Sequence, residues 1–257
     1  MRLLAVPFLL GLLGPAPAPE PSPADRLSWS ELPPLPNTPG YGGPFVGTHG
    51  SVLVVAGGAN FPDAAPWEGG EKVWHPDIHV LEAGEDRWRR AGTLPGPRAY
   101  GAAVSLPEGI AILGGSDAER HHAECWLLSW DPGSRGLRHS PLPLLPAPTA
   151  FPAAAAIGSV IYLAAGSAGP DPASLTHAFW ALDLSRPEGE RRWEKQPPWP
   201  GPARHKAVAA VQSGGGTTRY FHLFSGEKPS RAAAGGLSYD YRTDAYRFDP
   251  GTTTWER

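Results

Sequence analysis

The sequence predicts an all-β protein made of repeated four-stranded units, and three observations carry that prediction. The 257 residues include 32 glycines and 32 prolines, which is a turn-dense composition. Ten tryptophans accompany them, whereas disordered chains are poor in aromatic residues. Pairs of small residues recur at the ends of apolar runs. The length allows one or two domains, and a net charge of −3 provides no basic surface for nucleic acid.

The N-terminus has the layout of a secretory signal peptide. One arginine precedes an apolar stretch at residues 3–13, and the small residues "APA" follow at 16–18. The stretch is too short to span a bilayer as a helix, so cleavage near Ala18 is expected. The alternative is an uncleaved leader or an incorrectly assigned start. A periplasmic or secreted protein without a membrane anchor after cleavage is the resulting expectation. We expect three parts: a signal peptide at 1–18, a linker at 19–26, and a folded part at 27–257.

The repeat is visible in two markers that keep step along the chain. Apolar runs end in small residues in "SVLVVAGG", "GIAILGG", "VIYLAAG" and "YFHLFSG", at Gly58, Gly115, Gly166 and Gly226. These positions are separated by 57, 51 and 60 residues. A tryptophan follows later in three of the four units. The tryptophans are Trp88, Trp193 and Trp255, and the second unit lacks one.

Each unit reads as four short strands joined by tight turns. In the second unit they are "YGAAVSL", "GIAILGG", "CWLLSWD" and "GLRHSPL". Repeated four-stranded units with glycine and tryptophan markers are typical of a β-propeller, and a period of about 50 residues is that of kelch repeats. Glycine allows turns in which a Cβ would clash, and the tryptophan on the outermost strand can cover the space between neighbouring blades. A β-sandwich with irregular turns is the disfavoured alternative, because a sandwich has no reason to repeat the same glycine and tryptophan markers along the chain.

One segment is left over by the count of four units. "RLSWSELPPLP" at 26–36 looks like a fourth strand with its exit, yet it precedes the first complete unit. In a closed propeller, a leading outer strand commonly completes the last blade. The fourth unit already has its own outer strand at the end of the printed sequence. We therefore expect a truncated kelch β-propeller, with four blades visible and further blades beyond the C-terminus.

The first two units resemble a known family. "GYGGPFVGTHGSVLVVAGGANFPDAAPWEGGEKVWHPDIHVLE", followed by "RAYGAAVSLPEGIAILGG", is similar to the kelch-type N-acetylneuraminate epimerases, the sialic acid mutarotases, and most to their cyclically permuted branch. "VIYLAAGSAG" at 160–169 resembles the first blade of the unpermuted enzymes. The resemblance is specific over 41–115 and looser afterwards. It implies a six-bladed ring that interconverts the α and β anomers of free sialic acid.

The resemblance also implies a Glu and an Arg in a "GEAKPGLR"-like stretch. This chain has "GEKPSR" at 226–231, which contains Glu227 and Arg231. The stretch is two residues shorter, and the permuted blade order would place the true counterpart in the missing blades. Glu227 and Arg231 are therefore interpreted as a local substitute.

The long connection from Ala59 to Pro76 is the most unusual loop in the repeat. In a four-stranded blade, the loop from strand two to strand three emerges on the same face as the crossover to the next blade. The excursion and the crossover at 96–101 should therefore lie over one mouth of the central channel. Long loops in compact domains tend to be functional, so we expect this excursion to roof a pocket.

The contents of these loops suit a small acidic sugar. An arginine fork matches a carboxylate, a tryptophan face can stack on a sugar ring, and a base and an acid suffice to open and reclose the ring. That reaction needs no metal or organic cofactor. The catalytic candidates are Glu68, Lys72, His205 and Glu227, and the substrate-binding candidates are Asn60, Trp67, Trp74, Arg98, Tyr100, Arg204 and Arg231.

Structural alternatives stand beside several of these roles. The arginines of the crossovers, Arg98 and Arg204, could bridge adjacent blades. Trp67 and Trp74 could anchor the long loop on its own blade. Glu68 and Lys72 could form a solvated pair of little energetic value. A structural His205 is the favoured alternative. "RHHAEC" at 120–125 contains the single Cys125 but matches no zinc spacing, and "SGGGTTR" at 213–219 lacks the lysine of a phosphate loop.

Two functions remain open from the sequence. The first is a sugar mutarotase or epimerase acting on an acidic sugar such as N-acetylneuraminate. The second is a non-catalytic kelch propeller that binds a glycan or a protein partner. The fold alone does not choose between them, because propellers host both.

Overall fold

The computed structural model describes residues 27–36, 39–233 and 235–257, so the expected signal peptide and linker lie outside the described residues. The chain divides into two units, Met1–Leu32 and Pro33–Arg257. The described residues of the first unit form no helix or strand. In the described residues no helix is long and apolar enough to cross a membrane.

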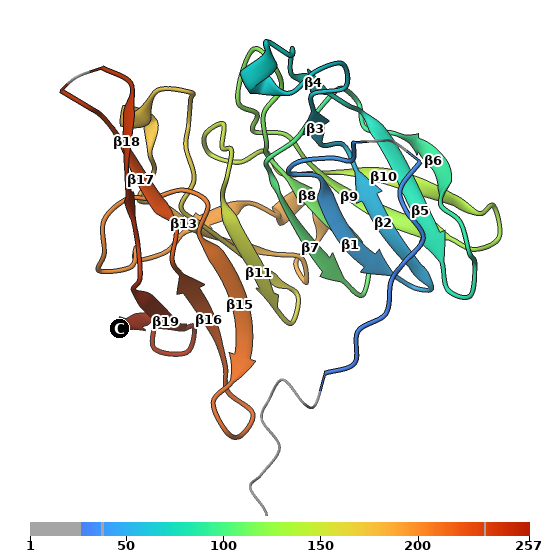
Figure 1. Cartoon of the computed structure of the whole chain (residues 1–257). Coiled ribbons are helices and arrows are strands. Elements are labelled where there is room, and N and C mark those ends of the chain that lie inside the picture. Colours follow the sequence, from blue (N-terminus) through green and yellow to red (C-terminus); the bar gives the residue numbers. More distant parts are fainter. Residues whose placement is uncertain (1–26, 37–38, 234) are drawn as a thin grey trace, which may run out of the picture. The chain divides into compact units, whose positions relative to one another are not determined.

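The second unit contains four antiparallel four-stranded sheets, which follow one another in chain order (Figure 1). The first sheet consists of β1 (Phe45–His49), β2 (Val52–Ala56), β5 (Asp77–Glu82) and β6 (Arg89–Thr93). The second consists of β7 (Ala102–Leu106), β8 (Gly109–Leu113), β9 (Cys125–Asp131) and β10 (Gly136–Leu142). The strands of this second sheet confirm the four strands predicted for the second sequence repeat.

The other two sheets repeat the same order. The third consists of β11 (Ala153–Ile157), β12 (Val160–Ala164), β13 (Phe179–Asp183) and β14 (Trp193–Lys195). The fourth consists of β15 (Val208–Ser213), β16 (Arg219–Phe224), β19 (Ala245–Asp249) and β20 (Thr254–Glu256). Within each sheet, every strand pairs antiparallel with its neighbour in sequence order, apart from short inserted elements.

Insertions lie in the strand-two-to-strand-three connections. The first sheet carries β3 (Ala59–Asn60), the 3₁₀ turn η2 (Pro66–Glu68) and β4 (Val73–Trp74). The fourth carries the hairpin of β17 (Glu227–Arg231) and β18 (Leu237–Tyr241), drawn in red in Figure 1. The third carries η3 (Pro172–Ser174), and a further 3₁₀ turn, η4 (Glu188–Glu190), connects β13 to β14.

One apolar core fills each space between neighbouring sheets. Ile78 and Val80 of the first sheet pack with Ile110 and Ile112 of the second. Because side chains alternate across a strand, the residues of β8 between these isoleucines face the third sheet. Ala111 is accordingly part of the next core, and all five residues of β8 are buried. The run "GIAIL" is apolar throughout because its sheet is covered on both faces.

The first strands of the four sheets are neighbours in chain order. β1 contacts β7, β7 contacts β11, and β11 contacts β15. The outer strands β6 and β10 also contact each other. Sheets that meet at their first strands and pack face to face through separate cores are blades of a propeller. The predicted kelch β-propeller architecture is therefore confirmed, and the described residues contain four four-stranded sheets of this kind.

The tryptophan markers tie each outer strand to the preceding blade. The indole Nε1 of Trp193 donates to Pro143 O at 3.0 Å, and that of Trp255 donates to Pro197 O at 2.7 Å. Trp88 makes the equivalent bond to Pro33 O at 2.7 Å. Pro33 therefore takes the place of a blade's exit segment, as expected from the leftover segment. Residues 27–36 nevertheless form no strand, because none of the described strands pairs with them.

The glycine pair of the first blade accommodates the close passage of the crossover chain. Gly57 has φ +63°, and a Cβ at this position would lie 2.2 Å from the carbonyl oxygen of Arg98. The next amide, that of Gly58, donates to the same oxygen at 2.8 Å. A side chain at Gly57 would have to displace this crossover. The third blade has Ala165 at the equivalent position, with φ +64°, and keeps the corresponding bond from the amide of Gly166 to Arg204 O at 2.9 Å. The small-residue pair thus fixes where each crossover enters the next blade.

Candidate active site

The insert of the first blade and the first crossover lie on one side of the propeller. The amide of Arg98 donates to the carbonyl oxygen of His75, at the end of the insert, at 3.2 Å. In the second blade, the amide of Thr149 donates to His122 O at 2.8 Å in the same way. The chain that enters each blade also bridges the residue after the small-residue pair of that blade, in Gly42–Ala59, Ala99–Ser116, Ala150–Ser167 and His205–Glu227. The expectation that insert and crossover share a mouth is therefore met by the geometry.

Four residues of left-handed backbone form an inner rim at this mouth. They are Gly43, Tyr100, Phe151 and Lys206, with φ of 60°, 62°, 55° and 53°. Each lies two residues before a blade's first strand, and backbone hydrogen bonds link each one to the next. The amide of Tyr100 donates to Gly43 O at 2.8 Å, that of Phe151 to Tyr100 O at 2.6 Å, and that of Lys206 to Phe151 O at 3.0 Å. Strained non-glycine backbone clusters at functional sites, so the rim is a place to look for one.

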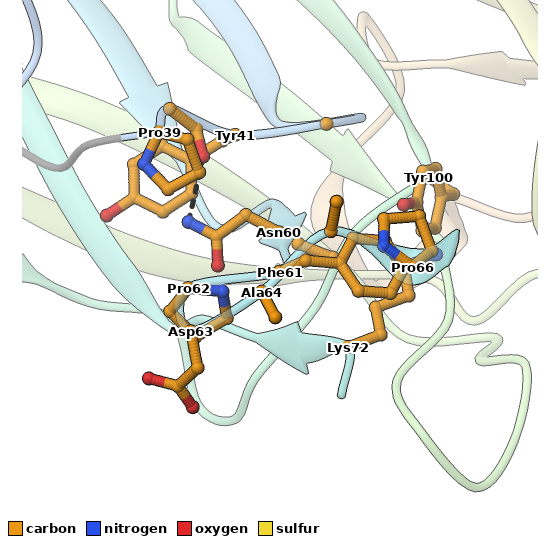
Figure 2. Close-up of a pocket in the computed structure, with 14 residues that line it drawn as sticks. Pro39, Tyr41, Asn60, Phe61, Pro62, Asp63, Ala64, Pro66, Lys72 and Tyr100 are labelled. Atoms are coloured by element: carbon orange, nitrogen blue, oxygen red, sulfur yellow. Dashed lines mark hydrogen bonds between the residues drawn. The ribbon is translucent and has the colours of Figure 1, made fainter. Parts of the chain in front are cut away.

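Three hollows adjoin one another along this rim. The first, of about 800 Å³, lies under the insert and includes Lys72 and Tyr100 in its wall, which Figure 2 shows beside Asn60 and Pro66. The second, of about 320 Å³, shares Lys72 and Tyr100 with the first. The third, of about 120 Å³, shares His121 and Phe151 with the second. Together they form a groove, and volumes of a few hundred Å³ are those of small-molecule sites.

A cluster of ionisable groups lies at the end of this groove, in the fourth blade. Glu227 is 8% exposed, and its Oε1 accepts a hydrogen bond from His205 Nε2 at 3.0 Å. The same oxygen accepts from Lys206 Nζ at 2.6 Å. His205 and Lys206 line the smallest hollow, together with Pro229 and Tyr239 of the fourth blade's hairpin. Because Glu227 and Pro229 are two residues apart on β17, their side chains leave the same face of the hairpin.

Both histidines at this end are held toward the neutral form. Burial is the main cause that lowers the pKa of His205, and Lys206 lowers it further while Glu227 opposes the shift. Burial likewise lowers the pKa of His121, whose Nδ1 donates to Ser167 O at 3.0 Å. His205 Nδ1 is buried and has no hydrogen-bond partner among the described residues. A neutral His205 that donates from Nε2 leaves Nδ1 as an acceptor.

Aromatic side chains connect the two ends of the groove. Lys72 Nζ lies 4.4 Å from the Tyr100 ring centroid and 4.8 Å from that of Trp74. The Tyr100 and Phe151 centroids are 4.9 Å apart, and those of Phe151 and His205 are 5.4 Å apart. The structure therefore brings five groups into one row, and four of them, Lys72, Trp74, Tyr100 and His205, are predicted site residues that come from three different blades.

The predicted residues of the insert differ in their relation to the groove. Trp67 is 83% exposed and is not part of the groove wall, whereas Trp74 lines the second hollow. Glu68 is exposed and accepts from the amide of Ala65 at 3.2 Å, within its own turn. Asn60 lines the first hollow, but its side chain is engaged by Gly40 O and by His75 Nε2, both at 2.8 Å.

The crossover arginines are engaged between loops. Arg204 is fully buried, and its guanidinium holds both carboxylate oxygens of Asp244 and the carbonyl oxygen of Ser225 at 2.9 Å. Arg98 is 5% exposed and donates to His122 Nδ1 at 3.0 Å, and burial lowers its pKa. This arrangement favours the structural alternative for both residues.

Arg231 also lies outside the groove wall. It is exposed on β17 and donates to Asp171 Oδ2 at 2.9 Å. Asp171 lines the smallest hollow, so this ion pair joins the hairpin of the fourth blade to the loop of the third. No group of three or more His, Cys, Asp or Glu in the described residues could hold a metal ion.

The sequence reasoning missed four residues of the smallest hollow that the site argument uses, His121, Phe151, Lys206 and Tyr239. Aligning the crossovers would have shown Phe151 and Lys206, since "PRAYG", "PTAFP" and "ARHKA" place them in register with Tyr100. His121 stood in the sequence next to a histidine of the Arg98 network, and spacing alone did not separate their roles.

Comparison with known proteins supports both the fold and the resemblance. Residues 21–135 match the family described as N-acetylneuraminate epimerase. A relative of that name from Brucella suis is 38% identical over 115 residues, which is 40% of this chain and 29% of the relative. "N-acetylneuraminate epimerase 1" of Escherichia coli O6:H1 is 35% identical over 100 residues, 35% of this chain and 26% of the relative. The aligned part therefore spans less than a third of these curated relatives.

A solved structure extends the comparison over nearly the whole chain. "Structure of YjhT" superposes with a TM-score of 0.70 at 17% identity, and covers 89% of this chain and 73% of that one. This likeness concerns the fold. The family match includes the insert and the first crossover and ends before the Glu227 cluster. The chain is thus a kelch-type β-propeller whose residues 21–135 are similar to the N-acetylneuraminate epimerases.

Proposed function

We propose that this protein interconverts the anomers of a free acidic sugar such as N-acetylneuraminate, by acid–base opening and reclosing of the sugar ring. The observation that carries the proposal is the contact of Glu227 with His205 and Lys206 at the end of a rim groove. The other end of that groove is built by the insert, which lies in the region similar to the N-acetylneuraminate epimerases.

Glu227 is suited to act as the base. Both of its hydrogen bonds fall on Oε1, so Oε2 remains for the anomeric hydroxyl of a sugar. Taking that proton allows the bond between the anomeric carbon and the ring oxygen to break, and the anomeric carbon becomes a carbonyl. The ring oxygen takes a proton from a second group. Tyr239 has a hydroxyl on the wall of the same hollow and could supply it.

Reclosure reverses these transfers after the carbonyl has turned. The ring hydroxyl attacks the other face of the carbonyl carbon, returns its proton to Tyr239, and the new anomeric oxygen recovers the proton held by Glu227. No atom is gained or lost and no electron changes hands. His205 holds the Glu227 carboxylate through Nε2 and fixes its orientation, which is worth more in a half-buried site than in water.

Anomer exchange observed by NMR tests the proposal directly. One-dimensional spectra of freshly dissolved N-acetylneuraminate would be followed with the full chain and with buffer at the same pH. We expect a faster approach to the anomeric equilibrium that scales with protein concentration. Sugar signals that broaden on binding while the exchange rate stays at the buffer value would support the non-catalytic glycan-binding alternative instead.

We also propose a periplasmic or secreted location, on the basis of the N-terminal sequence alone. The apolar stretch at 3–13 and the small residues at 16–18 support it. The intact mass of the protein purified from its native host would show a mature chain that starts near Pro19. A full-length mass would contradict cleavage.

A further inference from the structure

Lys206 departs from the pattern of the inner rim. The other rim positions carry glycine, tyrosine and phenylalanine, and Lys206 is the rim residue with a charge. Its φ of 53° is a left-handed conformation that L side chains rarely adopt. The backbone is held there by the amide bond to Phe151 O at 3.0 Å. The fold therefore fixes the direction in which this lysine leaves the rim.

The ammonium of Lys206 has capacity for a ligand. Nζ contacts Glu227 Oε1 at 2.6 Å and lies 5.6 Å from the Phe151 ring centroid. An ammonium has three donors, and Glu227 accepts one of them. The Lys206 side chain is 49% exposed, while that of Glu227 is 11% exposed. The unused donors therefore face the open side of the pair.

Other cations of the mouth are engaged or distant from this pair. Arg204 is committed to Asp244, and Arg231 to Asp171. Arg98 is buried against His122 and Glu124. Lys72 lines the first two hollows, whereas the smallest hollow is lined by Lys206. Lys206 is accordingly the cation beside the proposed base.

We propose that Lys206 is a specificity-determining residue that binds the carboxylate of the sugar while Glu227 acts on the anomeric hydroxyl; this rests on the proposed function. Because Nζ contacts Oε1 and the anomeric hydroxyl binds Oε2 of the same carboxylate, the two ligand groups must sit on the same carbon or on neighbouring atoms. A sugar acid with its carboxylate on the anomeric carbon meets this requirement. A uronic acid does not, because its carboxylate is on the ring carbon at the other side of the ring oxygen, which is not a neighbour of the anomeric carbon.

The experiment compares three sugars with four proteins. The sugars are N-acetylneuraminate, its methyl ester and glucuronic acid. The proteins are the wild type, Lys206→Met, Lys206→Arg and the matched control Lys228→Met, whose exposed lysine lies next to Glu227 in sequence but on the other face of β17. NMR anomer exchange gives kcat and KM, and NMR titration gives the affinity of each sugar separately.

Loss of the charge-assisted hydrogen bond between Lys206 and the carboxylate should weaken binding of the free acid and leave binding of the methyl ester unchanged. We expect Lys206→Met to raise KM and Kd for N-acetylneuraminate by about 10- to 100-fold, with the values for the methyl ester within about twofold of wild type. Lys206→Arg should restore part of the preference for the acid. Lys228→Met should behave as wild type, and glucuronic acid should be a poor substrate of every protein.

The measurements separate this inference from the proposed function. An unchanged ratio of acid to ester affinity in Lys206→Met would overturn the role of Lys206 even if the wild type is active. A wild type that accelerates no sugar would overturn the proposed function. In that case the titrations still decide about Lys206, because a selective loss of affinity for the acid supports a carboxylate site and an equal loss for acid and ester contradicts it.

Discussion

The first and the fourth blades carry the two most elaborate loops of the mouth, and they differ in what those loops do. The insert of the first blade is long and aromatic, but Glu68 is bonded within its own turn and Trp67 points to solvent. In the fourth blade, a carboxylate follows the glycine marker directly, where the first three blades have Ala59, Ser116 and Ser167. That carboxylate, Glu227, is buried and accepts hydrogen bonds from two basic side chains, His205 and Lys206. The proposed chemistry lies where the repeat is broken, at Glu227, and the long insert forms the wall at the other end of the groove.

The largest expected difference between the two blades is in catalysis. Glu227→Gln removes the proposed base and should slow anomer exchange by about 10²- to 10⁴-fold, the usual contribution of a general base. Glu68→Gln is the matched control from the insert and should stay within about twofold, because Glu68 faces solvent. The rates would be measured by NMR at fixed pH, with circular dichroism to verify folding. Equal effects of the two substitutions would move the chemistry out of the fourth blade.

The crossover arginines should differ in their contributions to stability. Arg204→Met leaves Asp244 unpaired with a side chain that is 10% exposed, so the free energy of unfolding should fall by about 3–5 kcal/mol. Arg98→Met leaves Glu124 with a side chain that is 37% exposed, and water can replace the lost partner. The expected loss is therefore smaller, about 1–3 kcal/mol. Urea denaturation of both variants checks the order, and the reverse order would refute the assignment of Arg204 as the main bridge.

The two blades also show which features of the fold and of the site could be predicted from the sequence alone. The glycine and tryptophan markers predicted the blades, because both are consequences of local contacts that every blade repeats, such as the Trp193–Pro143 and Trp255–Pro197 bonds. The arginine roles could not be derived in this way. The partner of Arg204 lies 40 residues later, and no period relates the two positions. The side-chain direction of Trp67 was also out of reach, because the insert packs by contacts that no other blade shares.

Acid sensitivity should reveal the same Arg204 bridge. Hydrogen bonding to Arg204 is the main cause that lowers the pKa of Asp244 from 3.8 to about 2. A carboxyl group with a lowered folded-state pKa stabilises the protein above its unfolded pKa, and this contribution is lost as the pH falls from about 4 toward 2. The free energy of unfolding should therefore drop by about 2 kcal/mol more in the wild type than in Asp244→Asn over this interval. Parallel pH profiles of the two proteins would contradict the pairing.

The smallest expected effects concern the two tryptophans of the insert, and they sharpen the boundary of the groove. Trp74 lines the second hollow and lies 4.8 Å from Lys72 Nζ, so Trp74→Ala removes both an apolar wall and a contact of the cation with the ring. A loss of about 0.5–1 kcal/mol for an exposed cation–π contact corresponds to a KM increase of about two- to fivefold. Trp67→Ala should leave KM and the free energy of unfolding unchanged within about 0.5 kcal/mol, because an 83% exposed side chain has little to lose. A larger effect of Trp67→Ala on KM would mean that the sugar reaches over the outer side of the insert, and the groove along the rim would not be its binding site.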